Sequence, residues 1–115
     1  MDLRAVIAII RRDQLERVEM GLREIGVRGI NVSKVKGYGE YHNFFSADWM
    51  VESVRLEIFT RKDKVDAITA AILESGHTGS PGDGIVVVYP IERFMNISLR
   101  SDATPDNICL DRRIA

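Results

Sequence analysis

The chain has 115 residues, of which 45% are hydrophobic and 29% are charged, and its formal net charge is −1. This length suits one compact domain and is too short for two. Lysine and arginine are offset by aspartate and glutamate along the chain, so the composition does not favour nucleic acid or an anionic membrane surface as a partner. A chain this short buries a modest share of its surface, and assembly with further copies would add stability.

The single cysteine and the first apolar segment bear on location. Cys109 has no second cysteine with which to form an internal disulfide, which fits a reducing cytosol. The apolar run that ends at Ile10 is too short to cross a membrane, and no signal-peptide cleavage site follows it. We therefore expect a cytoplasmic protein.

The N-terminal region predicts a strand followed by a helix. Residues 3–10 are rich in β-formers, and Asp13 after them is the predicted N-cap. Apolar residues then recur at helical spacing, at Leu15, Val18, Leu22 and Ile25. Gly26 is expected to end this helix because glycine tolerates positive φ.

The middle of the chain predicts two strands and a second helix. Residues 30–35 alternate as a strand does, and Gly37-Tyr38-Gly39 ends it. No period runs through residues 40–52, which we expect to form a loop before a third strand over 54–59. Asp63 is the predicted cap of the second helix, whose apolar stripe and terminal glycine are Val65, Ile68, Ile72 and Gly76.

The C-terminal third predicts a loop, a strand and a tail. Residues 77–84 hold three glycines and a proline and are expected to form a loop. A fully apolar strand over 85–88 follows, with Tyr89-Pro90 at its end. Residues 97–99 are expected to add a short edge strand, and residues 100–115 to form a tail that is mobile unless it docks.

The element order is strand, helix, strand, strand, helix, strand. This order predicts an α+β, ferredoxin-like βαββαβ sandwich, in which two helices cover one face of a four-stranded antiparallel sheet. Both parities of the strands carry apolar residues: one set is Ala5, Ile7, Ile9, Val54, Leu56 and Ile58, and the opposite set includes Val6, Ile10 and Phe59. A sheet that is apolar on both faces predicts a partner for the uncovered face, most simply another copy of the chain.

Several motifs resemble the PII family of signalling proteins over residues 1–99, and residues 100–115 remain as a C-terminal tail. Val35-Lys36-Gly37-Tyr38-Gly39 is similar to the family's VKGFG, which begins its effector loop, the T-loop, here at about residues 40–52. Val54-Arg55-Leu56-Glu57-Ile58 resembles the KxE strand that leaves this loop. Thr78-Gly79-Ser80-Pro81-Gly82-Asp83-Gly84 is similar to the TGxxGDG B-loop, here at residues 77–84. The segments 8–11 and 25–32 resemble the family's opening.

The resemblance implies a homotrimer that binds an adenine nucleotide in the clefts between subunits. Gly37, Tyr38 and Gly39 would line the cleft, Ile58, Phe59 and Thr60 would flank the adenine, and Gly82, Asp83 and Gly84 would approach the phosphates. Gly29, Ile30 and Asn31 would come from the adjoining chain, and Ile7 would add an apolar wall. Glycine-rich turns allow main-chain amides to approach phosphate oxygens, but each motif alone is also a common tight turn.

The sequence departs from the family at positions that hold phosphates. The family's lysine after GDG is Ile85 here, and the two arginines of its IRIRT segment align with Asn96 and Ser98. Glu40 and Tyr41 stand where the family has arginine and glutamine. Each lost charge-assisted contact is worth about 1.5–3 kcal/mol, so we expect ADP or AMP to be favoured over ATP.

Other residues of the chain could replace the missing phosphate-binding cations, and another small molecule could be the effector. Arg93 and Arg100, or the tail residues Arg112 and Arg113, could return a cation to the cleft, although surface charge is the alternative role for each. Sensing of 2-oxoglutarate in the family's manner is not expected, and bicarbonate is a further candidate effector.

The T-loop is shorter than in the family and carries aromatic residues. Tyr41, Phe44, Phe45 and Trp49 predict a partner-binding surface, or else a loop that folds back on them. The resemblance implies that the partner is a membrane transporter or a metabolic enzyme of nitrogen or carbon metabolism, which would place the protein at times at the inner membrane. The segment 108–113 is loosely similar to the tail of carboxysome-associated PII-like proteins. Those proteins have two cysteines in this tail, whereas this chain has Cys109 alone.

Other functions are weaker on these residues. A CutA-like or other ferredoxin-like trimer could bind a metal or a protein without nucleotide, but His42 and His77 lack metal-ligand spacing, and no metal is predicted. Arg11-Arg12 superficially resembles the anion-binding loop of an acylphosphatase, yet no paired carboxylates or activated nucleophile accompany it, so we do not expect an enzyme. Stabilisation by nucleotides would separate the sensor from these alternatives.

Overall fold

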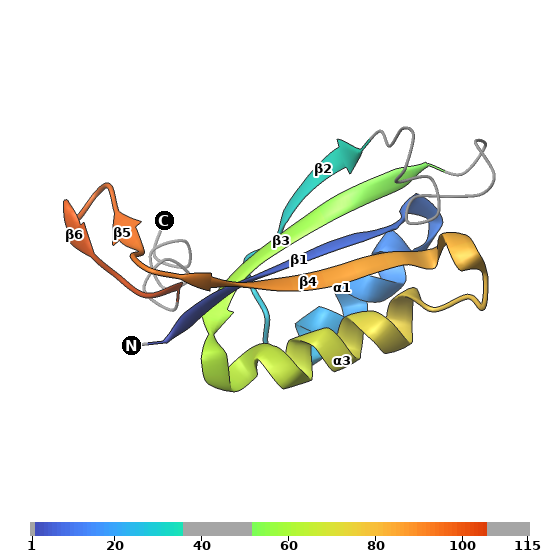
Figure 1. Ribbon diagram of the computed structural model, residues 1–115, viewed down its shortest axis with the longest axis horizontal. Coiled ribbons are helices and arrows are strands. Elements are labelled where there is room, and N and C mark those ends of the chain that lie inside the picture. The colour runs from blue at the N-terminus through green and yellow to red at the C-terminus, as the bar shows by residue number, and fades with distance from the viewer. Residues whose placement is uncertain (1, 36–51, 106–115) are drawn as a thin grey trace.

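A four-stranded antiparallel sheet with two helices on one face forms the body of the molecule. The computed structural model describes residues 2–35 and 52–105. The strands lie in the order β2 (Asn31–Val35), β3 (Ser53–Arg61), β1 (Leu3–Arg11), β4 (Gly84–Ile91). The helices α1 (Leu15–Glu24) and α3 (Val65–Gly76) lie side by side below the sheet in Figure 1. The predicted ferredoxin-like α+β fold is therefore confirmed.

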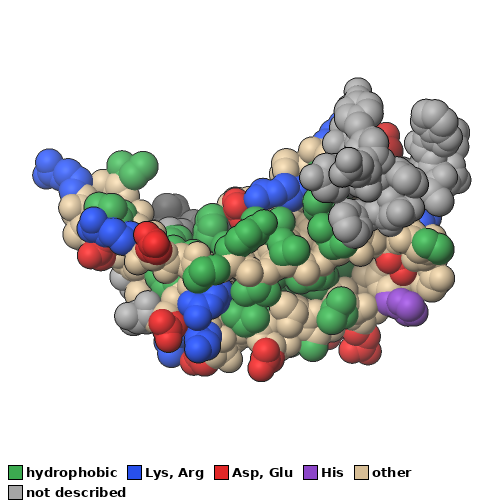
Figure 2. Space-filling model, in the orientation of Figure 1, with side chains coloured by type: hydrophobic (Ala, Val, Ile, Leu, Met, Phe, Trp, Pro, Cys, Tyr) green, Lys and Arg blue, Asp and Glu red, His purple; other side chains and the backbone are tan. Residues whose placement is uncertain are grey.

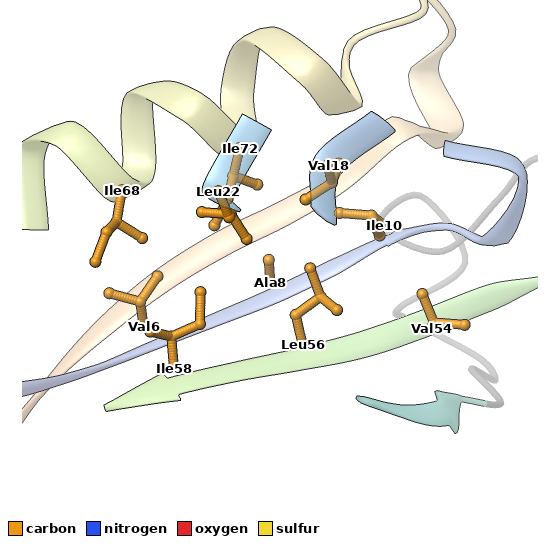
Figure 3. Packing of buried hydrophobic residues seen from close by; sticks show 10 residues of the cluster. All are labelled: Val6, Ala8, Ile10, Val18, Leu22, Val54, Leu56, Ile58, Ile68 and Ile72. Atoms are coloured by element: carbon orange, nitrogen blue, oxygen red, sulfur yellow. The ribbon is translucent and has the colours of Figure 1, made fainter. Parts of the chain in front are cut away.

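The core lies between this sheet and the two helices. Val6, Ala8 and Ile10 of β1 pair in register with Ile58, Leu56 and Val54 of β3 and face the helices. The helices contribute Val18, Leu22, Ile68 and Ile72, whose side chains point toward the strands in Figure 3. Each such side chain, when fully buried, contributes about 1.5–3 kcal/mol to folding.

The pairing corrects one grouping made from the sequence. Ile7 and Ile9 lie on the face of β1 opposite to Val54, Leu56 and Ile58, because the odd positions of β1 pair with the odd positions of β3. The core-facing residues of β1 are thus the even ones. Both faces of the sheet are nevertheless apolar, as the sequence predicted.

Short 3-10 turns join each of the two long strands to its helix, and they overturn the predicted helix caps. Asp13 lies inside η1 (Arg12–Gln14) and Asp63 inside η3 (Lys62–Lys64), while the α-helices begin after these turns with no side-chain cap. Each aspartate is therefore too early in the chain to reach the free amides of the first α-helical turn. Instead, Asp13 accepts from Arg11 at 3.3 Å and Asp63 accepts from Arg61 at 3.1 Å.

Glycine ends both helices, as predicted, but in different ways. Gly26 has φ +92° and follows α1, where the Val27 amide donates to the Leu22 carbonyl and the Gly26 amide to the Arg23 carbonyl. These two bonds form a Schellman motif, which satisfies carbonyls that the helix leaves free. Gly76 is the buried last residue of α3, and a Cβ there would lie 3.6 Å from a methyl of Val18.

The C-terminal part of the described chain is a hairpin that extends from the end of β4. β4 continues three residues past its predicted end and includes Pro90, which is tolerated because β4 is an edge strand. β5 (Met95–Asn96) pairs with β6 (Ser101–Asp102), and this hairpin projects from the body in Figure 1. The prediction of a strand over residues 97–99 is wrong, because these residues form the connecting turn, where the Asn96 side chain accepts from the Leu99 amide at 3.0 Å.

The expected boundary between residues 99 and 100 falls within this turn. The chain then returns toward the body, since the Ala103 amide donates to the Phe94 carbonyl at 2.9 Å and Pro105 is buried. Arg93 pairs with Asp102 at 3.2 Å across the base of the hairpin. The start of the predicted tail is therefore docked as far as Pro105.

Candidate functional site

The predicted site residues fall into two groups at opposite ends of the sheet. Gly84 pairs with Ile10 at one end of β1, whereas Thr60 pairs with Arg4 near the other. The six steps along the strand from position 4 to position 10 span about 20 Å. The two groups of one chain are thus too far apart for both to contact one mononucleotide closely. Seven further candidates lie outside the described residues: Gly37, Tyr38, Gly39, Tyr41, Phe44, Phe45 and Trp49.

The glycine-rich loop at the first end is organised around Asp83. Its carboxylate accepts from the amides of Thr78 at 2.7 Å and Gly79 at 3.1 Å, and also from the Thr78 hydroxyl. Burial works against ionisation of Asp83, but the hydrogen bonds from Thr78 and Gly79 outweigh it, so the pKa of this carboxyl lies below its usual value. The imidazole of His77 lies 3.7 Å from the same carboxylate.

Gly84 is required at the end of this loop by the packing of the backbone. Its φ is +112°, and a Cβ built on it would lie 1.7 Å from the carbonyl oxygen of Ile9. No side chain fits at that distance. The glycine that the motif assigns to a phosphate contact therefore also has an architectural reason to be glycine.

Several amides of the loop already have acceptors within the loop. The Gly82 amide donates to the Ser80 hydroxyl at 3.2 Å and the Asp83 amide to the Ser80 carbonyl at 3.1 Å. Together with the bonds to Asp83, they hold the loop in shape. Ile85 follows at the position where the family has lysine, on the face of β4 that is turned away from the helices. The loop is therefore preorganised but carries no cation of its own among residues 78–85.

A shallow pocket of about 170 Å³ lies at the other end of the sheet. Four of the predicted residues line it, namely Gly29, Ile58, Phe59 and Thr60. The lining also includes residues from the end of α1, the start of α3 and the docked tail: Ile25, Gly26, Val27, Arg28, Lys64, Ala67, Ile68 and Pro105. Sequence reasoning missed Arg28 and Lys64, although Arg28 lies within the segment 25–32 that resembles the family.

The remaining predicted residues have other surroundings. Ile30 packs against the core cluster, and Asn31 donates to the Glu57 carboxylate at 3.4 Å. Ile7 lies half-buried in the middle of the helix-free face, between Glu57 of β3 and Val87 of β4. None of these three residues lines the pocket.

The two arginines proposed as replacement cations lie on the hairpin and do not line the pocket. Arg93 is held by Asp102, and Arg100 is exposed in the turn with φ +53°. Within residues 2–35 and 52–105, no three His, Cys, Asp or Glu side chains come together as a metal site, and no helix is long and apolar enough to cross a membrane. His42 and Cys109 lie outside these residues.

Comparison with known proteins identifies the family. The family model described as "Nitrogen regulatory protein P-II" matches residues 3–101. The chain belongs to the P-II family. A P-II protein of Pasteurella multocida is 32% identical over 102 residues, which cover 83% of this chain and 91% of that protein. The resemblance seen in the glycine motifs is thereby confirmed.

Plant P-II proteins are similar as well. The P-II homolog of Arabidopsis thaliana is 36% identical over 100 residues, and that of rice is 35% identical. The chain spans about half the length of these two plant relatives, 51% and 47% respectively. The crystal structure of Arabidopsis thaliana PII bound to citrate superposes with a TM-score of 0.74 at 30% identity, covering 89% of each chain. The fold of the family thus applies to this P-II protein.

Proposed function

We propose that this P-II protein is a homotrimeric sensor that binds ADP or AMP in the clefts between subunits and transmits the bound state to a protein partner. The observation that carries this proposal is the division of the site between two ends of the sheet. Gly82, Asp83 and Gly84 lie at one end, and Gly29 and the segment 58–60 lie at the other. Two neighbouring copies would bring the opposite ends together around one nucleotide.

The helix-free face of the sheet supports assembly with further copies. Ile7 and Ile9 of β1 lie beside Val87 and Ile85 of β4 on this face, and no described helix covers them. Figure 2 shows hydrophobic side chains gathered along the hollowed upper side of the molecule, next to the projecting hairpin. Ile97 in the hairpin turn is 93% exposed, whereas isoleucine is among the residues most often buried in folded proteins. A second copy would cover both surfaces.

The preference for ADP or AMP follows from the charges near the glycine-rich loop. Ile85 replaces a cation, Asn96 and Ser98 replace two more, and Asp83 is ionised at neutral pH. Each further phosphate on the nucleotide would therefore add little binding free energy, because few positive charges are present to offset the cost of desolvating it. Bicarbonate is a further candidate effector of the same site.

The output of the sensor would be a change in partner binding. Nucleotide binding next to Gly37, Tyr38 and Gly39 would shift the population of conformations of the loop that follows them. A membrane transporter or a metabolic enzyme of nitrogen or carbon metabolism would read this change, with the protein in the cytoplasm or at the inner membrane. This function is regulatory and needs no catalysis.

Calorimetric titration and thermal unfolding with AMP, ADP, ATP and a cyclic nucleotide, each with and without Mg²⁺ and bicarbonate, test the proposal. A ligand at a hundred times its Kd adds about 2.7 kcal/mol of stability per site. We expect ADP or AMP to stabilise the protein more than ATP, with one site per subunit of a trimer measured by light scattering. No response to any nucleotide would contradict the sensor function and leave a trimer that binds another ligand or only a protein.

A further inference from the structure

The pocket at the end of the sheet has an apolar floor and a cationic rim. Ile58, Ile68 and Pro105 are buried within its lining, and Thr60, only 5% exposed, adds a hydroxyl. Among the residues that the structure describes, the charged ones that line it are Arg28 and Lys64. Because no described carboxylate shares the pocket, the charges favour an anionic ligand.

Arg28 differs from most other arginines of the described chain in its contacts. Arg11, Arg12, Arg55, Arg61 and Arg93 each pair with a carboxylate. Arg28 makes no side-chain hydrogen bond or ion pair within residues 2–35 and 52–105. The Schellman motif at Gly26 and Val27 fixes the chain immediately before it. The backbone of Arg28 thus has a fixed place beside the pocket, and the side chain is exposed with its donors available.

The size of the pocket limits which part of a ligand can enter it. About 170 Å³ is well below the roughly 300–1,000 Å³ of sites that enclose a whole drug-sized ligand. It suits a flat group such as a nucleobase. The ring of Phe59, 37% exposed, packs edge-to-face against Phe94 with 5.7 Å between the ring centroids. The sugar and phosphate of a bound nucleotide would then lie at the rim, where Arg28 is.

We propose that Arg28 is the specificity-determining residue that binds the phosphate nearest the ribose, and that the pocket therefore selects a nucleoside monophosphate group over the uncharged nucleoside. A guanidinium suits this task because its planar fork binds phosphate through two parallel hydrogen bonds. The glycine-rich loop of a neighbouring copy has Ile85 where the family has a lysine, and so lacks a cation for the phosphate. Arg28 of this chain would supply that cation. This inference rests on the proposed nucleotide function.

Titration of the full-length protein with AMP and with adenosine tests it. We expect the unaltered protein to bind AMP at least tenfold more tightly than adenosine. Arg28→Gln should weaken AMP binding by about 10- to 100-fold, the range for one charge-assisted contact. It should leave adenosine binding unchanged within twofold, since the base and the pocket floor are untouched. Arg28→Lys should restore part of the AMP affinity.

Arg23→Gln is the matched control, because Arg23 is exposed in α1 and does not line the pocket. It should bind both ligands as the unaltered protein does. Equal weakening of AMP and adenosine by Arg28→Gln would mean that Arg28 only shapes the pocket, and no weakening would place the phosphate elsewhere; either result overturns the inference alone. If the unaltered protein binds no nucleotide, the proposed function fails and this inference fails with it.

Discussion

At the scale of single residues, two adjacent residues of the glycine-rich loop, Asp83 and Gly84, maintain its conformation in different ways. Asp83 holds the loop through its carboxylate, which accepts from Thr78 and Gly79. Gly84 holds it by having no side chain, because the Ile9 carbonyl occupies the space where a Cβ would lie. The sequence motif contains both residues but does not distinguish these roles.

Replacing Gly84 with alanine should destabilise the protein strongly. The new Cβ would lie 1.7 Å from the Ile9 oxygen, so β4 would have to move away from β1. We expect a loss of about 3 kcal/mol or more in urea unfolding, typical of strain combined with disrupted pairing. Gly79→Ala is the control, since Gly79 also has positive φ, +89°, but its Cβ would meet nothing within 4 Å. It should cost about 1–2 kcal/mol, and equal losses for the two variants would contradict this account.

Replacing Asp83 with asparagine should lower stability in a pH-dependent way. The folded-state pKa of Asp83 is lowered, so the ionised group stabilises the fold above its unfolded pKa, and this contribution is lost as pH falls through the folded value. We expect Asp83→Asn to lose about 1–2 kcal/mol at pH 7, with the difference from the unaltered protein shrinking as the pH is lowered below about 4.

Urea unfolding from pH 7 downward measures this difference. Asp63→Asn is the control, because the pair of Asp63 with Arg61 is well exposed and such pairs contribute about 0–1 kcal/mol. A gap between Asp83→Asn and the unaltered protein that stays constant with pH would show that the carboxylate charge is not what holds the loop.

At the scale of elements, the two strand–turn–helix units are joined in a reciprocal way. The Arg12 amide at the end of β1 donates to the Glu52 carbonyl just before β3, at 2.8 Å. The Lys62 amide at the end of β3 donates to the Asp2 carbonyl just before β1, at 3.0 Å. The Arg12 and Glu52 side chains also form an ion pair, which lowers the pKa of Glu52. The end of the strand in each unit is thus hydrogen-bonded to the residue just before the strand of the other unit.

The helices are held to the sheet by their buried stripes, and this predicts a contrast within the helical layer. Leu22 of α1 is fully buried, whereas Leu73 of α3 is 63% exposed. Leu22→Ala should cost about 2–5 kcal/mol in the free energy of unfolding, because it removes apolar contacts and leaves a cavity. Leu73→Ala should change stability by no more than about 0.5 kcal/mol. Similar costs for both would mean that the helices do not pack in the arrangement of Figure 3.

At the scale of the whole molecule, one face of the sheet is covered by helices and the other is not. The helix-free face carries Ile7, Ile9, Ile85 and Val87 in adjacent register positions of two strands. A continuous apolar surface of this kind marks an interaction site. The separation of the two halves of the candidate site points to the same need for a neighbour.

A charge placed on the helix-free face should therefore prevent assembly without unfolding the chain. Val87→Glu should convert the proposed trimer to monomer in light scattering, because assembly through this face would bury an unpaired carboxylate at a cost of several kcal/mol. Nucleotide binding should be lost together with assembly. Met20→Glu is the control, since Met20 is 59% exposed on α1 at the helical side. A Val87→Glu protein that remains trimeric would place the interface elsewhere.

Hydrophobic periodicity in the sequence was enough to predict the strands and helices of the body, the uncovered apolar face and the glycine that ends α1. These features are local, since a period of two or of about four residues is written in neighbouring positions. The order of the glycine motifs was enough to indicate the P-II family, because each motif needs particular residues at adjacent positions.

Only the tertiary structure decided the features that depend on contacts between distant segments. The aspartates predicted as caps lie in 3-10 turns that follow the paired strands β1 and β3, and residues 97–99 form the turn between the paired strands β5 and β6. Arg28 joins Phe59 and Pro105 around one pocket although these residues are far apart in sequence. Strand register, unlike periodicity, is set by pairing across the fold. The register of β1 with β3 and β4 places the two halves of the site at opposite ends of the sheet.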